Sequence, residues 1–239
     1  MGNSRKTIVA LHGAGMTGAV FGGLAPHLPD HHFRALTLPG HDPQSSTDLL
    51  TNITSMAAWL KEKLAGGPGD VILVGHSMGA LIALAAADAP EVAGLVLIGA
   101  AAKMPVNADL LKIARETPNE AIGMIVKWGV HGGHPQVGAV RTVLSAVMHA
   151  ANPAAVGADL AVCDNFADGA ALARAVRVPA LVLSGDKDKM VKPAAGEQLA
   201  ALIPDAHHVL LPECGHTAMV EMPIDTATAL RDFIAAKIS

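Results

Sequence analysis

The sequence has few charged residues and no long run of apolar ones. Lys, Arg, Asp and Glu make up 16% of the 239 residues, their signs are interspersed, and the formal net charge at pH 7 is −4. Such a composition excludes a disordered polyelectrolyte and a nucleic-acid-binding protein with a basic face. The apolar run from Leu81 to Ala87 ends at Asp88, far short of the roughly 18 residues that indicate a membrane span. We expect a soluble protein with no nucleic-acid partner and no membrane span.

Cysteine is also scarce, since Cys163 and Cys214 are the only two. A chain of this length can bury a substantial core without a disulfide, and the spacing of the two residues matches no metal motif. The first residues contain no small-residue cleavage site of a secretion signal, and Lys6 stands where a myristoylation pattern requires Ser or Thr. These features predict a cytoplasmic protein with reduced thiols.

Short runs rich in Val, Ile and Leu recur along the chain. Those read as strands are Thr7–Leu11, Phe33–Leu38, Val71–Val74, Gly94–Ile98, Ala180–Leu183 and Val209–Leu211. The first four are almost continuously apolar, which fits a sheet covered on both faces and therefore mostly parallel strands joined by helices. The predicted fold class is α/β, with a mostly parallel six-stranded sheet flanked by helices.

Helical patterns fill the gaps between these strands. Four of them are Thr47–Leu64, Met78–Ala87, Lys192–Leu202 and Ile224–Lys237. From residue 101 to residue 178 the strand signal disappears, and helical patterns follow one another at Ala108–Glu116, Asn119–Val130, Val137–Ala150 and Ala154–Phe166. We predict a core made of residues 1–100 and 179–239, with residues 101–178 inserted in it as a helical cap.

The sharpest chemical signal is Gly75-His76-Ser77-Met78-Gly79, a G-x-S-x-G pattern between a predicted strand and a predicted helix. At such a turn the serine backbone is strained, and the flanking glycines remove side chains that would clash with neighbouring elements. We expect Ser77 to be an exposed nucleophile and the Met78 N–H, at the helix start, to bind an oxyanion. The alternative is a glycine turn whose serine has no chemical role.

A second glycine-rich bend, His12-Gly13-Ala14-Gly15, follows the first predicted strand and could complete an oxyanion hole. Residues Gly13 to Gly18 also have the pattern G-x-G-x-x-G of a dinucleotide-binding loop. That interpretation requires an acid at the end of the second strand, but the next acid, Asp42, lies beyond a Pro-Gly turn. We therefore expect no nucleotide cofactor.

A serine hydroxyl needs a base, and a histidine base needs an acid that fixes its tautomer. Gly185-Asp186-Lys187-Asp188 follows a predicted strand and offers two acids. His216 follows the last predicted strand and precedes the final helix, which is where the base should lie. The order Ser, Asp, His fits loops that line one edge of a parallel sheet.

These motifs together resemble the α/β-hydrolase superfamily over nearly the whole chain, specifically a serine esterase or lipase with a helical cap. The resemblance implies that Asp188, the third residue after Gly185, is the acid rather than Asp186. It implies oxyanion donors at the backbone N–H groups of Ala14 and Met78, and a structural role for His76. Two features depart from the family: the N-terminal antiparallel hairpin is missing, and Asp42 stands where relatives often have a glycine.

The remaining histidines suggest no metal site. His131 and His134 flank two glycines, but no third ligand stands at metal-binding spacing. His207 and His208 are predicted to lie at a strand edge. We therefore expect no metal and no cofactor.

The predicted activity is hydrolysis of a small to medium, fairly apolar carboxylic ester through an acyl-enzyme, by a monomer or homodimer. Apolar cap residues could line an adaptable pocket, although the same residues could merely pack one cap helix on another. The candidates are Met104, Met124, Trp128 and Met148. The alternatives are a hydrolase of C–C bonds in ring-cleavage products, a lactone or thioester hydrolase, and a ligand receptor on a hydrolase scaffold.

Overall fold

A single parallel sheet forms the centre of the protein. The computed structural model describes residues 5–45, 47–67 and 69–238. The sheet has the strand order β2-β1-β3-β4-β5-β6, and every neighbouring pair is parallel. Its strands are β1 (Thr7–Leu11), β2 (His32–Leu36), β3 (Val71–His76), β4 (Val92–Ile98), β5 (Ala180–Gly185) and β6 (Ala206–Leu211). The predicted fold class is thereby confirmed.

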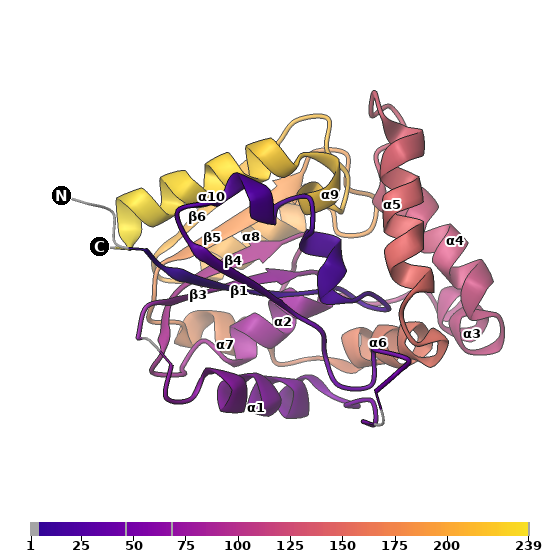
Figure 1. Cartoon of the computed structure of the whole chain (residues 1–239), viewed down its shortest axis with the longest axis horizontal. Coiled ribbons are helices and arrows are strands. Elements are labelled where there is room, and N and C mark those ends of the chain that lie inside the picture. The colour runs from indigo at the N-terminus through magenta and orange to yellow at the C-terminus, as the bar shows by residue number, and fades with distance from the viewer. Residues whose placement is uncertain (1–4, 46, 68, 239) are drawn as a thin grey trace.

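Helices cover both faces of this sheet, because alternate residues of each apolar strand point to opposite sides. In β1, Val9 and Leu11 join one buried cluster, whereas Ile8 and Ala10 join the other. The Val9 side is covered by α1 (Ile53–Leu64), α2 (Met78–Ala85), α7 (Gly169–Ala175) and α8 (Pro193–Leu202). The Ile8 side is covered by the 3-10 helix η1 (Gly18–Phe21) and by α10 (Pro223–Lys237) (Figure 1).

Four further helices lie beyond the carboxyl ends of the strands, between β4 and β5 in the chain. They are α3 (Ala108–Glu116), α4 (Pro118–Gly129), α5 (Val137–His149) and α6 (Pro153–Asn165). They pack mainly on one another, and they project from one end of the sheet in Figure 1. By contrast α7, which the predicted cap includes, packs against α2 and α8.

The largest deviations from the predicted elements lie at element ends. Strand β2 ends at Leu36 rather than Leu38, because it pairs residue for residue with β1 and the Leu38 N–H then donates to His12 Nε2 at 3.0 Å. Helix α1 begins at Ile53 rather than Thr47, because Asn52 caps it by accepting from Ser55 N at 2.8 Å. The short elements η1, η2 (Ala25–His27), α7 and α9 (Ala218–Glu221) have too few residues for a clear period.

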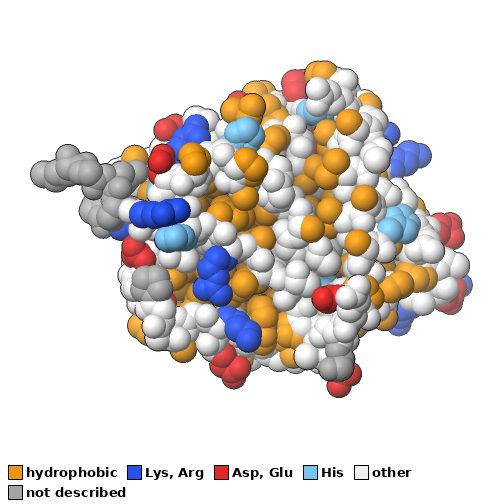
Figure 2. Space-filling view, viewed as in Figure 1, with side chains coloured by type: hydrophobic (Ala, Val, Ile, Leu, Met, Phe, Trp, Pro, Cys, Tyr) orange, Lys and Arg blue, Asp and Glu red, His pale blue; other side chains and the backbone are white. Residues whose placement is uncertain are grey.

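No helix of the described residues is long and apolar enough to cross a membrane. Charged side chains of both signs are scattered over the face in Figure 2, and hydrophobic side chains lie between them, including near its middle. Cys163 and Cys214 are buried and form no disulfide with each other. The secretion and lipidation predictions concern the N-terminus, of which residues 1–4 lie outside the described residues.

Candidate active site

Ser77 lies at the turn between β3 and α2 with a backbone φ of 52°, a left-handed conformation that is strained for serine. The flanking glycines are required by close packing. A Cβ on Gly75 would lie 2.5 Å from the backbone nitrogen of Ala80, and a Cβ on Gly79 would collide with the carbonyl oxygen of Leu11. The strain therefore persists because strand, turn and helix leave no room for another path.

His216 lies on the loop between β6 and α9, and its ring is almost completely buried. Its Nδ1 donates a hydrogen bond to Asp188 Oδ2 at 2.8 Å. Its backbone N–H donates to the carbonyl of Gly129, the last residue of α4, at 2.7 Å. The His216 loop is thus joined directly to the inserted helices.

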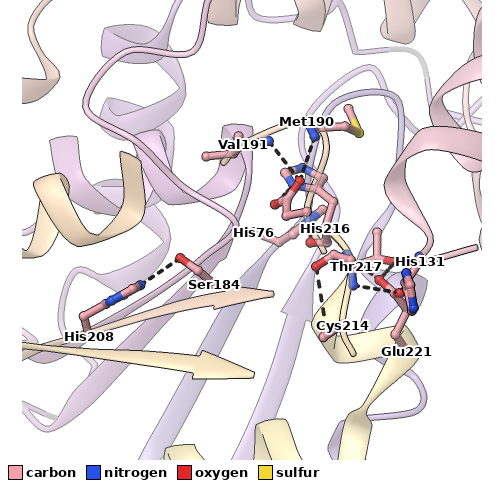
Figure 3. Close-up of polar contacts among 12 residues, drawn as sticks. His76, His131, Ser184, Met190, Val191, His208, Cys214, His216, Thr217 and Glu221 are labelled. Carbon is pink, nitrogen blue, oxygen red and sulfur yellow. Dashed lines mark hydrogen bonds and ion pairs between the residues drawn. The ribbon is translucent and has the colours of Figure 1, made fainter. Parts of the chain in front are cut away.

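Asp188, on the loop after β5, accepts hydrogen bonds on both of its carboxylate oxygens. Oδ2 binds His216, and Oδ1 accepts from the N–H groups of Met190 at 2.8 Å and Val191 at 2.9 Å (Figure 3). Asp186 instead pairs with Lys187 Nζ at 2.8 Å. Of the two acids that the sequence offered, Asp188 is the one in contact with His216.

Two opposing effects act on the His216 ring. Burial lowers its pKa, because the charged imidazolium loses hydration. The charge of Asp188, the hydrogen bond from Nδ1 to that carboxylate and the charge of Glu221 all favour the protonated form. Their combined effect is larger, so the pKa of His216 lies above its ordinary value of 6.5.

His76, directly before Ser77, is fully buried and lies beside His216. The two ring centroids are 4.8 Å apart, and His76 Nε2 donates to the carbonyl of His216 at 3.1 Å. Burial and the nearby His216 charge lower the pKa of His76 well below 6.5, so it stays neutral. Its contacts agree with the structural role that the resemblance implied.

Glu221 forms a cage of hydrogen bonds around the His216 loop. Its Oε2 accepts from Gly215 N at 2.9 Å and from His131 N at 2.8 Å. Its Oε1 accepts from both the N–H and the hydroxyl of Thr217, each at 3.0 Å (Figure 3). The buried carboxylate therefore satisfies the residues on either side of His216 and links them to the segment after α4.

A cavity of about 70 Å³ lies against Ser77 and His216. Except at these two residues, His76 and Thr217, its lining is apolar or weakly polar. Lining residues from the inserted segment and nearby loops include Met16, Met104, Val106, Ile125, Leu144, Leu160, Cys163, Met190 and Val191. No Lys, Arg, Asp or Glu is among its described lining residues.

Of the four pocket residues predicted from the sequence, the structure brings Met104 to this cavity. Met148 is buried in the core cluster, Met124 packs against that cluster, and Trp128 is 38% exposed. These three are not among the lining residues. Periodicity predicted their helices, but it could not tell which face of each helix would turn toward Ser77.

The two predicted oxyanion donors lie at the same place. Ala14 lines the cavity, and Met78 is the first residue of α2, directly after Ser77. Among the described residues, neither backbone N–H donates a hydrogen bond to another backbone group. Both N–H groups thus remain candidates for binding a developing negative charge.

Sequence reasoning missed a buried polar group beside the Ala14 loop. Asp159 of α6 is completely buried, and its Oδ2 accepts from Gly15 N and from His41 Nε2, each at 2.8 Å. An acid spaced three and four residues from Val156 and Cys163 on one helix face was the available signal.

The other histidines considered from the sequence have ordinary polar partners. His131 Nε2 lies 3.2 Å from Glu213 Oε2, and His134 Nε2 donates to the Glu221 carbonyl at 3.0 Å. His207 and His208 lie on β6, an edge strand, where His208 Nε2 lies 3.0 Å from Ser184 Oγ. No group of three or more His, Cys, Asp or Glu side chains among the described residues is arranged to hold a metal ion.

Comparison with known proteins gives a consistent result. Residues 8–229 match the alpha/beta hydrolase family. The chain is 29% identical to a pimeloyl-[acyl-carrier protein] methyl ester esterase of Aromatoleum aromaticum, over 97% of this chain and 99% of the relative. Among solved structures, an esterase of Thermogutta terrifontis superposes with a TM-score of 0.85 at 21% identity, covering 98% of this chain and 90% of that one. An esterase of Exiguobacterium antarcticum gives a TM-score of 0.85 at 17% identity, covering 97% and 92%.

Proposed function

Because the chain belongs to the α/β-hydrolase family and is a hydrolase, we propose that it cleaves small to medium, fairly apolar carboxylic esters with Ser77, His216 and Asp188. The observation on which this proposal rests is the convergence of three loops. Ser77 and His216 line one cavity, and a buried carboxylate from a third loop binds the far side of the imidazole.

The mechanism follows from the positions of the protons. Asp188 accepts from Nδ1, so neutral His216 carries its proton there and presents Nε2 as a base. Nε2 removes the Ser77 proton as the oxygen attacks the ester carbonyl, and the N–H groups of Ala14 and Met78 bind the oxyanion. His216 then protonates the departing alcohol. Water, activated by the same base, hydrolyses the acyl-enzyme and releases the acid.

The lining of the cavity favours an uncharged substrate. No described lining residue carries a formal charge when His76 and His216 are neutral, so a carboxylate or phosphate close to the reacting carbonyl would be desolvated without a partner. The small volume favours short and medium acyl groups. The name of the Aromatoleum relative supports an ester with a small alcohol.

Hydrolysis and labelling together test the proposal. The wild type should cleave p-nitrophenyl esters with acyl groups in the range of two to twelve carbons, with a preference for the shorter ones. A fluorophosphonate probe should label it, and Ser77→Ala should lose both properties. Ser184→Ala is the control, because the buried Ser184 hydroxyl also lies near a histidine, His208, but is not among the described residues that line the cavity.

Other outcomes would point to the alternative functions. A wild type that binds apolar ligands but is neither labelled nor active would be a receptor on this fold. A labelled protein that does not hydrolyse esters but cleaves a vinylogous diketone would be a C–C hydrolase. A labelled protein that prefers lactones or thioesters would be a lactone or thioester hydrolase.

A further inference from the structure

The inserted helix α6 places a buried carboxylate directly against the loop that carries Ala14. Asp159 Oδ2 accepts the Gly15 N–H at 2.8 Å, and Gly15 is the residue that follows Ala14. Gly15 has a φ of +65°, and a Cβ there would lie 2.8 Å from the Cβ of Val156, one turn before Asp159 on α6. The loop and the helix are therefore in direct contact at this point.

The second partner of Asp159 is a buried histidine of the core. His41 Nε2 lies 2.8 Å from the same Oδ2, and His41 Nδ1 lies 3.1 Å from the Pro39 carbonyl. Because both ring nitrogens face acceptors, this geometry favours the ring with both protons and a positive charge. Burial lowers the pKa of His41, but the hydrogen bond and charge of Asp159 outweigh it and raise the pKa above 6.5.

The peptide before Ala14 is oriented from the other side. His12 accepts from Leu38 N on Nε2, so its proton lies on Nδ1, which donates to the Gly13 carbonyl at 2.9 Å. Burial, with the charge of His41, lowers the pKa of His12 to about 3, so its ring is neutral. That carbonyl shares its peptide group with the Ala14 N–H. The two peptide groups on either side of Ala14 are thus each bound by a buried side chain.

Burial of the Asp159 carboxylate lowers the stability of the fold, which indicates a functional reason for an acid at this position. Its Oδ1 has no hydrogen-bond partner among the described residues. An unpartnered buried carboxylate oxygen destabilises a fold, and an apolar residue would fill the same place on α6 without that penalty.

We propose that Asp159 is a positioning residue of the oxyanion hole, through which the inserted helix α6 orients the Ala14 N–H toward the reacting carbonyl oxygen. This inference rests on the proposed function. Asp159 does not line the cavity, so it acts on the transition state through the Gly15 peptide and not by contact with the substrate. Its loss should weaken oxyanion binding and leave ground-state binding of the ester largely unchanged.

Kinetics of Asp159→Ala and Asp159→Asn with a short p-nitrophenyl ester test this role. Loss of a direct oxyanion donor lowers kcat by about 10²–10³-fold. We expect a smaller effect for a residue one peptide away, roughly 10–100-fold in kcat for Asp159→Ala, with KM within about twofold. Asp159→Asn keeps an oxygen that can accept the Gly15 N–H, so its kcat should lie between those of Asp159→Ala and the wild type.

A trifluoromethyl ketone inhibitor provides the readout that a merely structural role would not change. It forms an oxyanion adduct with the serine, so its inhibition constant should rise in the variants by the same factor as kcat falls. Asn152→Ala is the matched control. Asn152 Nδ2 donates to the Gly40 carbonyl at 2.9 Å and so joins the start of α6 to the His41 loop without touching Gly15. This control should lose stability but keep kcat and the inhibition constant.

These measurements distinguish failure of the positioning role of Asp159 from failure of the proposed esterase function. An active wild type whose Asp159 variants lose thermal stability but keep kcat and the inhibition constant would overturn the positioning role, as would an equal loss in Asn152→Ala. If Asp159→Ala does not fold, Asp159→Asn alone decides. A wild type that neither cleaves esters nor reacts with fluorophosphonate would refute the proposed function, and this inference would fall with it.

Discussion

His216 is buried beside a carboxylate, and this environment predicts the pH dependence of the activity. In the proposed mechanism His216 must be neutral to accept the Ser77 proton, so activity should fall when pH drops through the pKa of His216. Because that pKa is raised, the acidic limb of the kcat/KM profile should have its midpoint above pH 6.5. Asp188→Asn removes the charge that raises the pKa, so the midpoint should move to lower pH while kcat falls by about 10³–10⁴-fold.

Asp186→Asn is the control for this measurement, because Asp186 lies two residues away and pairs with Lys187 at the surface. It should leave the rate and the midpoint near wild-type values. An acidic limb below pH 6.5 in the wild type, or an equal loss in both variants, would contradict the assignment of Asp188.

We expect the conservative substitution Glu221→Gln to have a large effect on stability. All four hydrogen bonds to its carboxylate come from donors around His216. In Glu221→Gln the amide nitrogen must face two of these donors, and each buried donor left unpaired costs about 1–3 kcal/mol. We expect the free energy of unfolding, measured with urea, to fall by about 2–5 kcal/mol, with a loss of kcat. Glu213→Gln, at a side chain that is 65% exposed, should change stability little. An equal loss of stability in Glu221→Gln and Glu213→Gln would refute the structural role of the Glu221 hydrogen bonds.

At the scale of the element, the turn from β3 to α2 depends on how closely α2 approaches β1. A Cβ on Gly79 would collide with the backbone of Leu11 and His12, and backbone cannot move aside as a flexible side chain can. Gly79→Ala should therefore lower the free energy of unfolding by about 3 kcal/mol or more and abolish activity.

Gly123→Ala separates packing from helix propensity. Gly123 lies inside α4, and a Cβ there would meet nothing within 4 Å. Alanine is favoured over glycine in a helix interior by about 0.5–1 kcal/mol, so this variant should be slightly more stable than the wild type. The midpoint of thermal unfolding should therefore fall in Gly79→Ala and rise in Gly123→Ala, relative to the wild type.

At the scale of the whole molecule, the cavity is bounded by core loops on one side and inserted helices on the other. Leu144 of α5 is fully buried and lines the cavity, whereas Val140, one turn earlier, is buried but does not. Leu144→Ala should enlarge the cavity and shift the preferred p-nitrophenyl ester toward longer acyl chains, with a stability loss of about 2–5 kcal/mol. Val140→Ala should lose stability without that shift, and an unchanged chain-length profile in Leu144→Ala would place the acyl group elsewhere.

Local signals in the chain were sufficient to predict the α/β class, the parallel sheet and the strand-to-helix turn that carries Ser77. Continuously apolar strands indicate a sheet covered on both faces, and glycines at 75 and 79 indicate a tight strand-to-helix turn. His216 was predicted as the base because a base is expected on the loop after the last strand. The choice of Asp188 over Asp186 came from family resemblance alone, and the contact with His216 agrees with it.

The contacts between side chains from distant segments could not be predicted from local patterns, because long-range packing creates them. Asp159 is 144 residues from Gly15, and Glu221 is 90 residues from His131, so no spacing in the chain relates them. The same holds for the cavity, which Cys163 and Leu144 line together with Ser77 but Trp128 does not. Helical periodicity predicts that a helix has a buried face, but the rotation of that helix against its neighbours depends on packing that involves the whole chain.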